Sequence, residues 1–316
     1  MHPSALLLIM VAAIAAPACA TTAVTTPAAR FWEENLPGTP MPPTIAELVQ
    51  KGTDHSPLKQ PSSSPQVYQP DACLGYSYRI TCSPSAAVAA TGVFFRQENV
   101  ALGSVMTVHF PPVDLPAILP RADAEKAPFA NVSDVLATFS IASGSTRESN
   151  VRTTIRACQA PPLAGERKTC ATSLEGGVRA AARMLGTSVA RLSVAASALT
   201  PREGLPRQEY EVVAVAPLGG GRHVTCHDDP FPYAVYRCHM EKEASTEAYV
   251  LTLRGLQYGS GAPVVVDMVT VCHLDTSNWS SAHPAFETLN LRPGGAPVCH
   301  FMPYADLLFT EKAANA

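Results

Sequence analysis

The chain changes from helical spacing of its apolar residues in the middle to short β-rich runs near the C-terminus. Residues 148–158 and 173–185 carry apolar side chains at helical spacing, and Gly186 stands where a helix C-cap is expected. Before them, residues 104–110 alternate as in a strand. After the second helix we expect β-rich segments at residues 210–215, 222–227, 234–240, 248–253, 264–273 and 286–291. Helices followed by antiparallel strands predict an α+β fold.

The N-terminus has the pattern of a secretory signal. An apolar run covers positions 6–16, and a small-x-small motif ends at Ala20, so residues 1–20 are predicted to be a signal peptide cleaved after Ala20. The run is shorter than the roughly 20 apolar residues that cross a bilayer, and no later run is long enough. We therefore expect a secreted protein with no membrane span.

Residues 21–91 are rich in proline, which removes backbone donors and favours extended or irregular backbone. We expect little of this N-terminal segment to enter a packed core. The exception is a short motif at 31–49, which begins with Phe31 and Trp32 and runs into an apolar pattern. Thr44, with a glutamate three residues later, predicts a capping box and a short amphipathic helix. This helix is expected to dock on the main domain or on a partner.

Composition describes an ordinary globular chain. It has 316 residues, a net charge of −3, and 47% hydrophobic against 16% charged residues. That length is enough for one large domain with its own core, or for two small ones. No basic patch suggests a nucleic-acid partner. The main domain is expected to begin at Gly92 and to cover residues 92–311.

Secretion changes the meaning of the cysteines. The chain has nine cysteines, and removal of Cys19 with the signal peptide leaves eight. In an oxidising compartment this even number fits four disulfides, whose pairing the count alone does not decide. Two sequons, at Asn131 and Asn278, become candidate glycosylation sites. The eight candidates for disulfides are Cys73, Cys82, Cys158, Cys170, Cys226, Cys238, Cys272 and Cys299.

One dipeptide recurs four times near the C-terminus: Cys226-His227, Cys238-His239, Cys272-His273 and Cys299-His300. Four of the nine cysteines and four of the nine histidines lie in these pairs, which is more than a random scatter would give. Consecutive side chains of a strand point to opposite faces, so each pair can direct a thiol to one face and an imidazole to the other. One row of side chains can then form bridges while the other binds.

The spacing of these pairs resembles the signature of the plant BURP domain, which reads CH, ten residues, CH, then two longer gaps each ending in CH. Here the gaps are 10, 32 and 25 residues, and the long middle gap contains the glycine-rich stretch 255–263, where an insertion is tolerated. The Phe-Phe opening at 94–95 and Cys170-Ala-Thr-Ser-Leu-Glu also resemble the family, whereas Phe309 stands where the family usually has Trp. The resemblance implies a disulfide-stapled domain. Residues 31–49 are similar to the N-terminal segment of RAFTIN-type anther proteins and of the polygalacturonase non-catalytic beta subunit.

Within this resemblance, oxidised cysteines disfavour a zinc-finger site and leave the imidazoles as candidate ligands. Imidazole suits copper, zinc and nickel, and copper(II) stands highest in the affinity order, so copper is the candidate cofactor. The four cysteines of the pairs would form two bridges among themselves, and Cys158 would pair with Cys170, which leaves Cys73 for Cys82. The candidate copper ligands are His227, His239, His273 and His300.

A single histidine beside a cysteine usually only hydrogen-bonds a backbone carbonyl, but four such pairs favour a shared metal or polar cluster. Further histidines at 109, 223 and 283 are possible added ligands, although each alone is better explained structurally. His55 is expected to be solvated. Candidate partners for the imidazoles, chosen for their nearness in sequence, are Asp228, Asp229 and Asp275.

The resemblance implies two classes of function. One is a non-enzymatic protein of the apoplast or cell wall, with wall polysaccharide or wall protein as partner and a developmental role in the anther or pollen wall. The alternative is a copper-dependent peptide cyclase, which joins a Tyr or Trp side chain to another residue of a core peptide. Only residues 69–76, Gln-Pro-Asp-Ala-Cys-Leu-Gly-Tyr, resemble such a core, and they occur once. We expect the first class, with the catalytic residues unknown.

Overall fold

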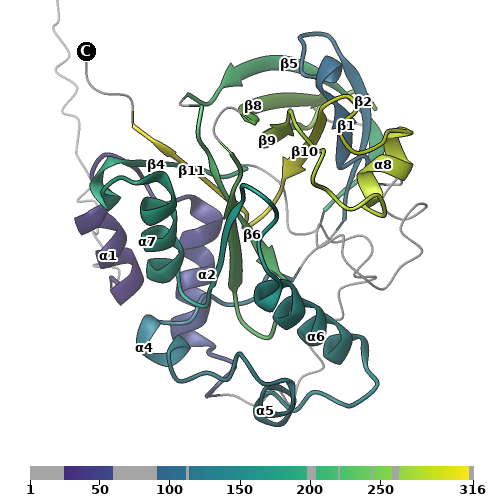
Figure 1. The fold of residues 1–316 in the computed structure, drawn as a ribbon. Coiled ribbons are helices and arrows are strands. Elements are labelled where there is room, and N and C mark those ends of the chain that lie inside the picture. Colours follow the sequence, from purple (N-terminus) through teal and green to yellow (C-terminus); the bar gives the residue numbers. More distant parts are fainter. Residues whose placement is uncertain are drawn as a thin grey trace, which may run out of the picture.

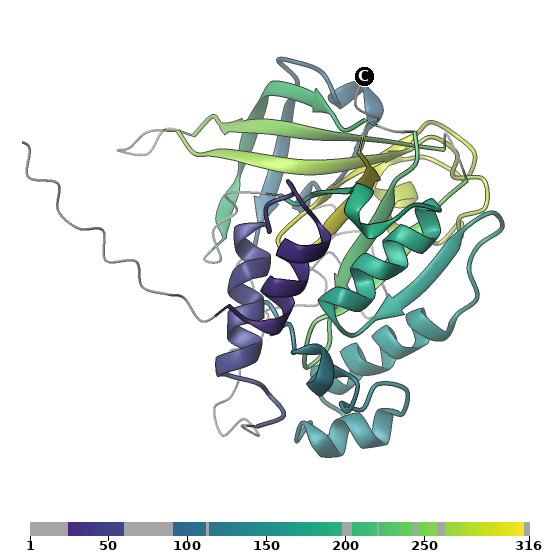
Figure 2. The same ribbon diagram turned by 90° about the vertical axis from the view of Figure 1, so that its left-hand side faces the viewer.

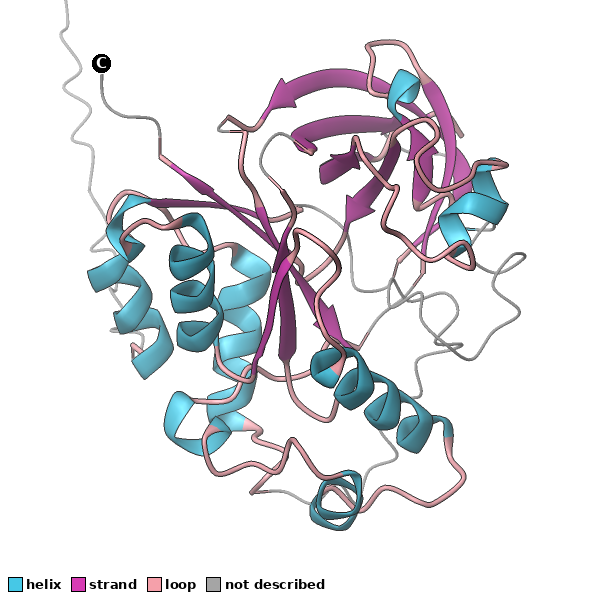
Figure 3. Ribbon diagram, viewed as in Figure 1, coloured by secondary structure: helices cyan, strands magenta, loops and turns pink. Residues whose placement is uncertain are grey.

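A computed structural model describes residues 25–59, 91–111, 114–197, 204–219, 221–242, 245–257 and 263–312. These residues form two antiparallel sheets, with most of the helices gathered around one of them (Figures 1 and 3). The predicted α+β class is confirmed. Within the described ranges no helix has the length and apolar character needed to cross a membrane.

The smaller sheet has the strand order β3-β7-β6-β11-β4. Side chains along each strand alternate between the two faces of the sheet. One face packs against three helices, α1, α2 and α7, which cover that side of the sheet (Figure 2). The strands are β3 (Arg167–Ala171), β4 (Leu192–Ala195), β6 (Val224–Asp229), β7 (Val235–Met240) and β11 (Leu307–Glu311).

The larger sheet has the order β1-β10-β9-β8-β5-β2 and curves around a second apolar core that contains Phe110, Tyr210 and Phe301. Two of its strands shift register, between Val108 and Phe110 and between Val212 and Ala214, as in β-bulges, which bend a sheet. The strands are β1 (Phe94–Arg96), β2 (Val105–Phe110), β5 (Leu205–Pro217), β8 (Thr246–Gly255), β9 (Val265–His273) and β10 (Val298–Met302).

The two sheets meet face to face through Val269, Val271 and Met302 of the larger sheet and Leu308 of the smaller one. Ser197 ties them further, because its hydroxyl accepts from the Val269 N–H and donates to the carbonyl of Met302. The layer between the sheets is therefore closed by packed apolar side chains and by the hydrogen bonds of Ser197.

The helices follow the sequence pattern in the middle of the chain. The two expected there are α6 and α7, and Gly186 is the left-handed C-cap of α7, with φ of 67°. The helices are α1 (Pro27–Asn35), α2 (Pro43–Asp54), α4 (Arg121–Ala124), α5 (Val132–Thr138), α6 (Thr146–Gln159), α7 (Leu174–Leu185) and α8 (Pro284–Leu289), with 3-10 turns at Gln97–Asn99 and Val189–Arg191.

The N-terminal helices contribute more to the core than the proline content suggested. Trp32 is only 1% exposed, and it packs with Leu36, Ile45 and Leu48 into the same cluster as α7 and the smaller sheet. The motif therefore docks on the main domain. The predicted capping box is wrong: α2 begins at Pro43, whose ring suits the first turn, and no side chain caps it.

A second correction concerns residues 286–291, which were expected to be β-rich. They lie largely in α8, which starts at Pro284, is capped by His283, and ends at Asn290 in the left-handed conformation. A short apolar run does not distinguish a strand from a helix, so the local caps decided the structure here.

Candidate metal centre

Each Cys-His pair divides its two side chains between opposite faces of its strand. Cys226 lies directly opposite Cys238 across β6 and β7, and Cys272 lies opposite Cys299 across β9 and β10. The first two thiols belong to the helix-covered core and the other two to the core of the larger sheet. All four imidazoles consequently face the layer between the sheets.

The cysteines form the expected bridges. Cys226 bonds to Cys238 and Cys272 to Cys299, so the four paired cysteines make two disulfides among themselves. Cys158 bonds to Cys170 and joins α6 to β3. The expected pair of Cys73 and Cys82 lies outside the described residues. The disulfides thus fix the strands that carry the histidines.

The four histidine rings form one cluster. His227 lies 5.5 Å from His239 and 5.6 Å from His300, measured between ring centroids. His273 lies 5.3 Å from His300 and 6.4 Å from His239. Residues separated by up to 73 positions, 227 to 300, are therefore brought into a closed ring of imidazoles. We call these four side chains the histidine cluster.

Three carboxylates lie against the Nδ1 atoms of three of the four imidazoles. Nδ1 of His227 lies 2.9 Å from Asp306, and Nδ1 of His273 lies 2.8 Å from Glu241. Nδ1 of His239 lies 3.2 Å from Glu166, an ion-pair distance, although its alignment is too poor for a hydrogen bond.

These carboxylates replace the ones expected from sequence. Asp229 instead forms a two-pronged ion pair with Arg237, and Asp275 accepts from the N–H of Ser277. Asp228 uses its backbone N–H to donate to Asp306, and its own Oδ1 is buried without a partner. The expectation of partners near in sequence is therefore wrong, because the real partners approach from other strands and loops.

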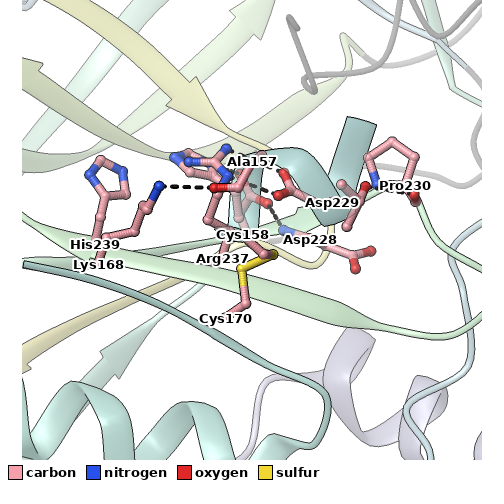
Figure 4. A network of polar contacts seen from close by, with 12 residues as sticks. Ala157, Cys158, Lys168, Cys170, Asp228, Asp229, Pro230, Arg237 and His239 are labelled. Carbon is pink, nitrogen blue, oxygen red and sulfur yellow. Dashed lines mark hydrogen bonds and ion pairs between the residues drawn. A yellow bond between two sulfur atoms is a disulfide. The ribbon is translucent and has the colours of Figure 1, made fainter. Parts of the chain in front are cut away.

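Figure 4 shows charged side chains near His239, a member of the cluster. Arg237 lies against Asp229, and Lys168 donates to the carbonyl of Ala157 beside the Cys158–Cys170 disulfide. Because Arg237 and His239 belong to the same face of β7, a fixed positive charge stands close to the imidazoles.

Burial lowers the pKa of three of the four imidazoles. The pKa values of His227 and His300 are held well below the usual range, first by loss of solvent and then by neighbouring positive or histidine side chains. The pKa of His239 is lowered as well, also mainly by burial. Burial opposes the charge of Glu166, but contacts with His239 outweigh it and lower the pKa of Glu166 to about 2. The neutral imidazole is the form of histidine that binds a metal ion.

The closest contact in the cluster joins two ring nitrogens. Nε2 of His273 lies 3.2 Å from Nε2 of His300. Nδ1 of His273 faces the carboxylate of Glu241, and Nδ1 of His300 lies 3.0 Å from the carbonyl of Phe301. Since these partners only accept, both Nδ1 atoms carry a hydrogen, and the two Nε2 atoms can share a proton or a metal cation between them.

The chemistry of this donor set fits a transition metal. Two imidazole nitrogens that bind one ion at about 2.0 Å lie roughly 3 Å apart, which is the spacing of the His273 and His300 pair. Carboxylates on the far ring nitrogen, as at His227 and His273, are the usual support of a ligating histidine. Among the described residues, no group of three or more His, Cys, Asp or Glu side chains has the spacing of an assembled site. The facing Nε2 atoms of His273 and His300, with both Nδ1 atoms engaged, nevertheless match the tautomer of a ligating histidine.

An aromatic side chain lies against one edge of the cluster. The ring of Trp279 is 4.8 Å from that of His273 and 4.5 Å from that of His283. Trp279 is half-buried. Burial opposes the charge of Glu241, but the contact with His273 outweighs it and lowers the pKa of that carboxyl, and a hydrogen bond with Trp279 adds to the lowering. No pattern in the sequence pointed to this role, because Trp279 lies outside the Cys-His pairs.

The remaining histidines have structural contacts. Nδ1 of His223 lies 3.2 Å from the hydroxyl of Thr246, and Nδ1 of His283 accepts from the N–H of Ala285. His109 lies on β2 in the larger sheet, and His55 is exposed just after α2. Both predicted sequons are exposed: Asn131 at the start of α5, and Asn278 beside Trp279.

Comparison with known proteins agrees with the arrangement of the pairs. The profile of the BURP domain matches residues 93–311. Protein RAFTIN 1B of Triticum aestivum is 43% identical over 231 residues, which cover 72% of this chain and 61% of the relative. BURP domain-containing protein 5 of Oryza sativa subsp. japonica is 34% identical over 294 residues, covering 90% and 86%. BURP domain protein RD22 of Arabidopsis thaliana is 35% identical over 252 residues, covering 77% and 60%. This chain thus spans less than two thirds of the length of the wheat and Arabidopsis relatives.

Proposed function

Because the chain belongs to the BURP domain family of plant proteins, we propose that it is a secreted protein of the apoplast or cell wall that binds copper between its two sheets. The histidine cluster carries the metal part of the proposal. Nε2 of His273 and Nε2 of His300 face each other at 3.2 Å with both Nδ1 atoms already engaged, so a cation is favoured between them.

His227 and His239 complete the proposed ligand set, because their rings adjoin the other two and share the same layer. Copper(II) is preferred over other divalent ions on imidazole ligands, and when bound it would supply one-electron redox chemistry. Asp306 and Glu241 orient the rings of His227 and His273, and the two disulfides prevent the strands from moving apart.

The metal proposal is tested on the full secreted chain, dialysed against copper(II) and then against buffer, with metal measured by atomic absorption. We expect the wild type to retain copper, and His273→Ala and His300→Ala to lose most of it. His55→Ala, at an exposed position after α2, is the control and should retain as much as the wild type. Equal retention of copper by all four proteins would contradict the proposal.

Secretion is supported by the signal-like N-terminus and by the three disulfides, which persist in oxidising compartments. The proposed role is non-enzymatic and developmental, in the anther or pollen wall, with wall polysaccharide or wall protein as partner. We expect the secreted protein to sediment with pectin or insoluble wall material. Recovery of all the protein in the soluble fraction would count against wall binding.

A second candidate is a copper-dependent peptide cyclase, which is favoured by the position of Trp279. That ring shows that an aromatic side chain fits beside His273. Closing a bond between an aromatic side chain and a second residue removes two electrons and two protons, and dioxygen would accept all four and leave as hydrogen peroxide, with bound copper relaying the electrons one at a time. The candidate core, residues 69–76, lies outside the described residues. Incubation of the full chain with copper(II) in air should lower the mass by two hydrogens within residues 60–85, and an unchanged mass would exclude cyclisation of this chain's own core.

A further inference from the structure

Two loops with contacts to the histidine cluster meet beside it. The first loop, residues 160–166, ends at Glu166, which lies against His239. The second, residues 274–283, carries Trp279 against His273. A group that covers the place where they meet therefore stands next to two of the four imidazoles.

The two loops touch through Asn278. Its amide Nδ2 lies 3.5 Å from the carbonyl oxygen of Ala164, two residues before Glu166. Asn278 is exposed and is followed by Trp279 and Ser280, which completes an acceptor sequence for N-linked sugar. The atom that would carry the sugar is thus the atom that approaches the other loop.

We propose that Asn278 carries an N-linked glycan that covers the junction of these loops and shields Trp279 from large solutes. The inference rests on the secretory part of the proposed function, because the sugar is added only in that pathway. A glycan is bulky and polar, whereas a metal ion is small. The modification would therefore act as a size filter, which admits the ion and obstructs large molecules.

The surface around Asn278 suits such a cover. Leu163 is 43% exposed on the first loop, and Trp279 is half-buried on the second. Sugar rings laid over these two side chains would remove apolar area from water, at about 25 cal/mol per Å². The glycan can therefore make favourable apolar contacts with this surface.

The other sequon provides an internal comparison. Asn131 is the N-cap of α5, and its Oδ1 accepts from the N–H groups of Ser133 and Asp134, so a sugar on its nitrogen leaves the cap intact. Figure 1 shows α5 at the end of the molecule remote from β9 and β10, which carry His273 and His300. A glycan at Asn131 is too distant to shield Trp279.

The first experiment measures occupancy. The full chain is expressed in a secreting plant host, and glycopeptides are analysed by mass spectrometry in the wild type, Ser280→Ala and Ser133→Ala. We expect sugar at Asn278 in the wild type and in Ser133→Ala, and none there in Ser280→Ala. Secreted protein with sugar at Asn131 but none at Asn278 would overturn this inference alone. Protein kept inside the cell with neither site modified would overturn secretion and the inference with it.

The second experiment measures shielding through tryptophan fluorescence. The chain has two tryptophans, and Trp32 is only 1% exposed, so quenching by a solute reports mainly on Trp279. With a bulky neutral quencher, we expect Ser280→Ala to be quenched about twofold more strongly than the wild type, because the bulky sugar is missing. Ser133→Ala should match the wild type. Equal quenching of all three proteins would overturn the shielding, even with Asn278 occupied.

Discussion

Asp306 holds His227 from the turn that precedes β11: its Oδ2 lies 2.9 Å from Nδ1 of the imidazole. Its other oxygen accepts from the N–H of Asp228, so one carboxyl group fixes both the ring and the strand end that carries it. This contact links residues 79 positions apart and closes one side of the histidine cluster. Burial of this carboxyl group also makes the stability of the fold depend on pH.

Burial raises the pKa of Asp306 to about 7, whereas an unfolded chain would titrate near about 3.9. With its pKa raised by folding, the group contributes stability that is full below about pH 4 and is lost as the pH rises through about 7. The free energy of unfolding of the wild type, minus that of Asp306→Asn, should fall by up to about 1.4 kcal/mol per pH unit across this window. Urea unfolding at several pH values measures it. Asp134→Asn, at an exposed position, is the control, and a difference independent of pH would contradict the prediction.

Two helical glycines are expected to respond oppositely to alanine. A Cβ on Gly52 of α2 would come within 1.8 Å of the carbonyl oxygen of Ile118, whereas on Gly177 of α7 its nearest neighbour is Ala171 at 3.9 Å. Gly52→Ala should therefore destabilise the protein although alanine favours helix, and Gly177→Ala should stabilise it by about 0.5–1 kcal/mol. Thermal unfolding compares the two. A gain in stability from both substitutions would show that α2 does not pack tightly on residue 118.

The two disulfides behind the histidines should contribute unequally. Cys272 and Cys299 are 27 positions apart, and Cys226 and Cys238 only 12. In the chain-entropy account, the longer loop gains about 0.7 kcal/mol more from closure. Replacing both cysteines of each pair by alanine and measuring urea unfolding should show this order. We also expect weaker copper retention by the double variant at 272 and 299, because His273 and His300 lie on the strands released. A variant that retained copper as the wild type does would show that packing alone holds these strands.

The N-terminal helices should be essential to the main domain. Trp32 is buried, and its indole N–H donates to the carbonyl of Thr39, whose hydroxyl donates to the carbonyl of Leu192, the first residue of β4. Trp32→Ala should lower the free energy of unfolding by about 3–5 kcal/mol. The exposed Glu33→Ala in the same helix is the control, and circular dichroism during urea unfolding measures both. A similar small loss for the two variants would mean that α1 docks only loosely.

The local sequence pattern was sufficient to predict part of this structure. The alternation of thiol and imidazole follows from strand geometry, and α6 and α7 follow from apolar spacing. Glu166, Glu241 and Asp306 could not be found in that way, because nothing near them in sequence marks them as partners of His239, His273 and His227. Their role depends on which strands and loops become neighbours. The N-terminal helices were underestimated for the same reason, since their core is supplied by α7 and the smaller sheet.

The position of His273 at the base of the β8–β9 hairpin has a consequence for how such chains can vary in length. It lies opposite Thr246, where the two strands begin to pair, and the hairpin extends from there as far as Val265 and Arg254. Adding or removing pairs of residues at the far end changes the gap between the second and third Cys-His pairs without moving any imidazole. A single residue inserted between Cys272 and His273 would instead turn the ring toward the wrong core. The segments between the Cys-His pairs can therefore vary in length, whereas the two residues of each pair must remain adjacent in sequence.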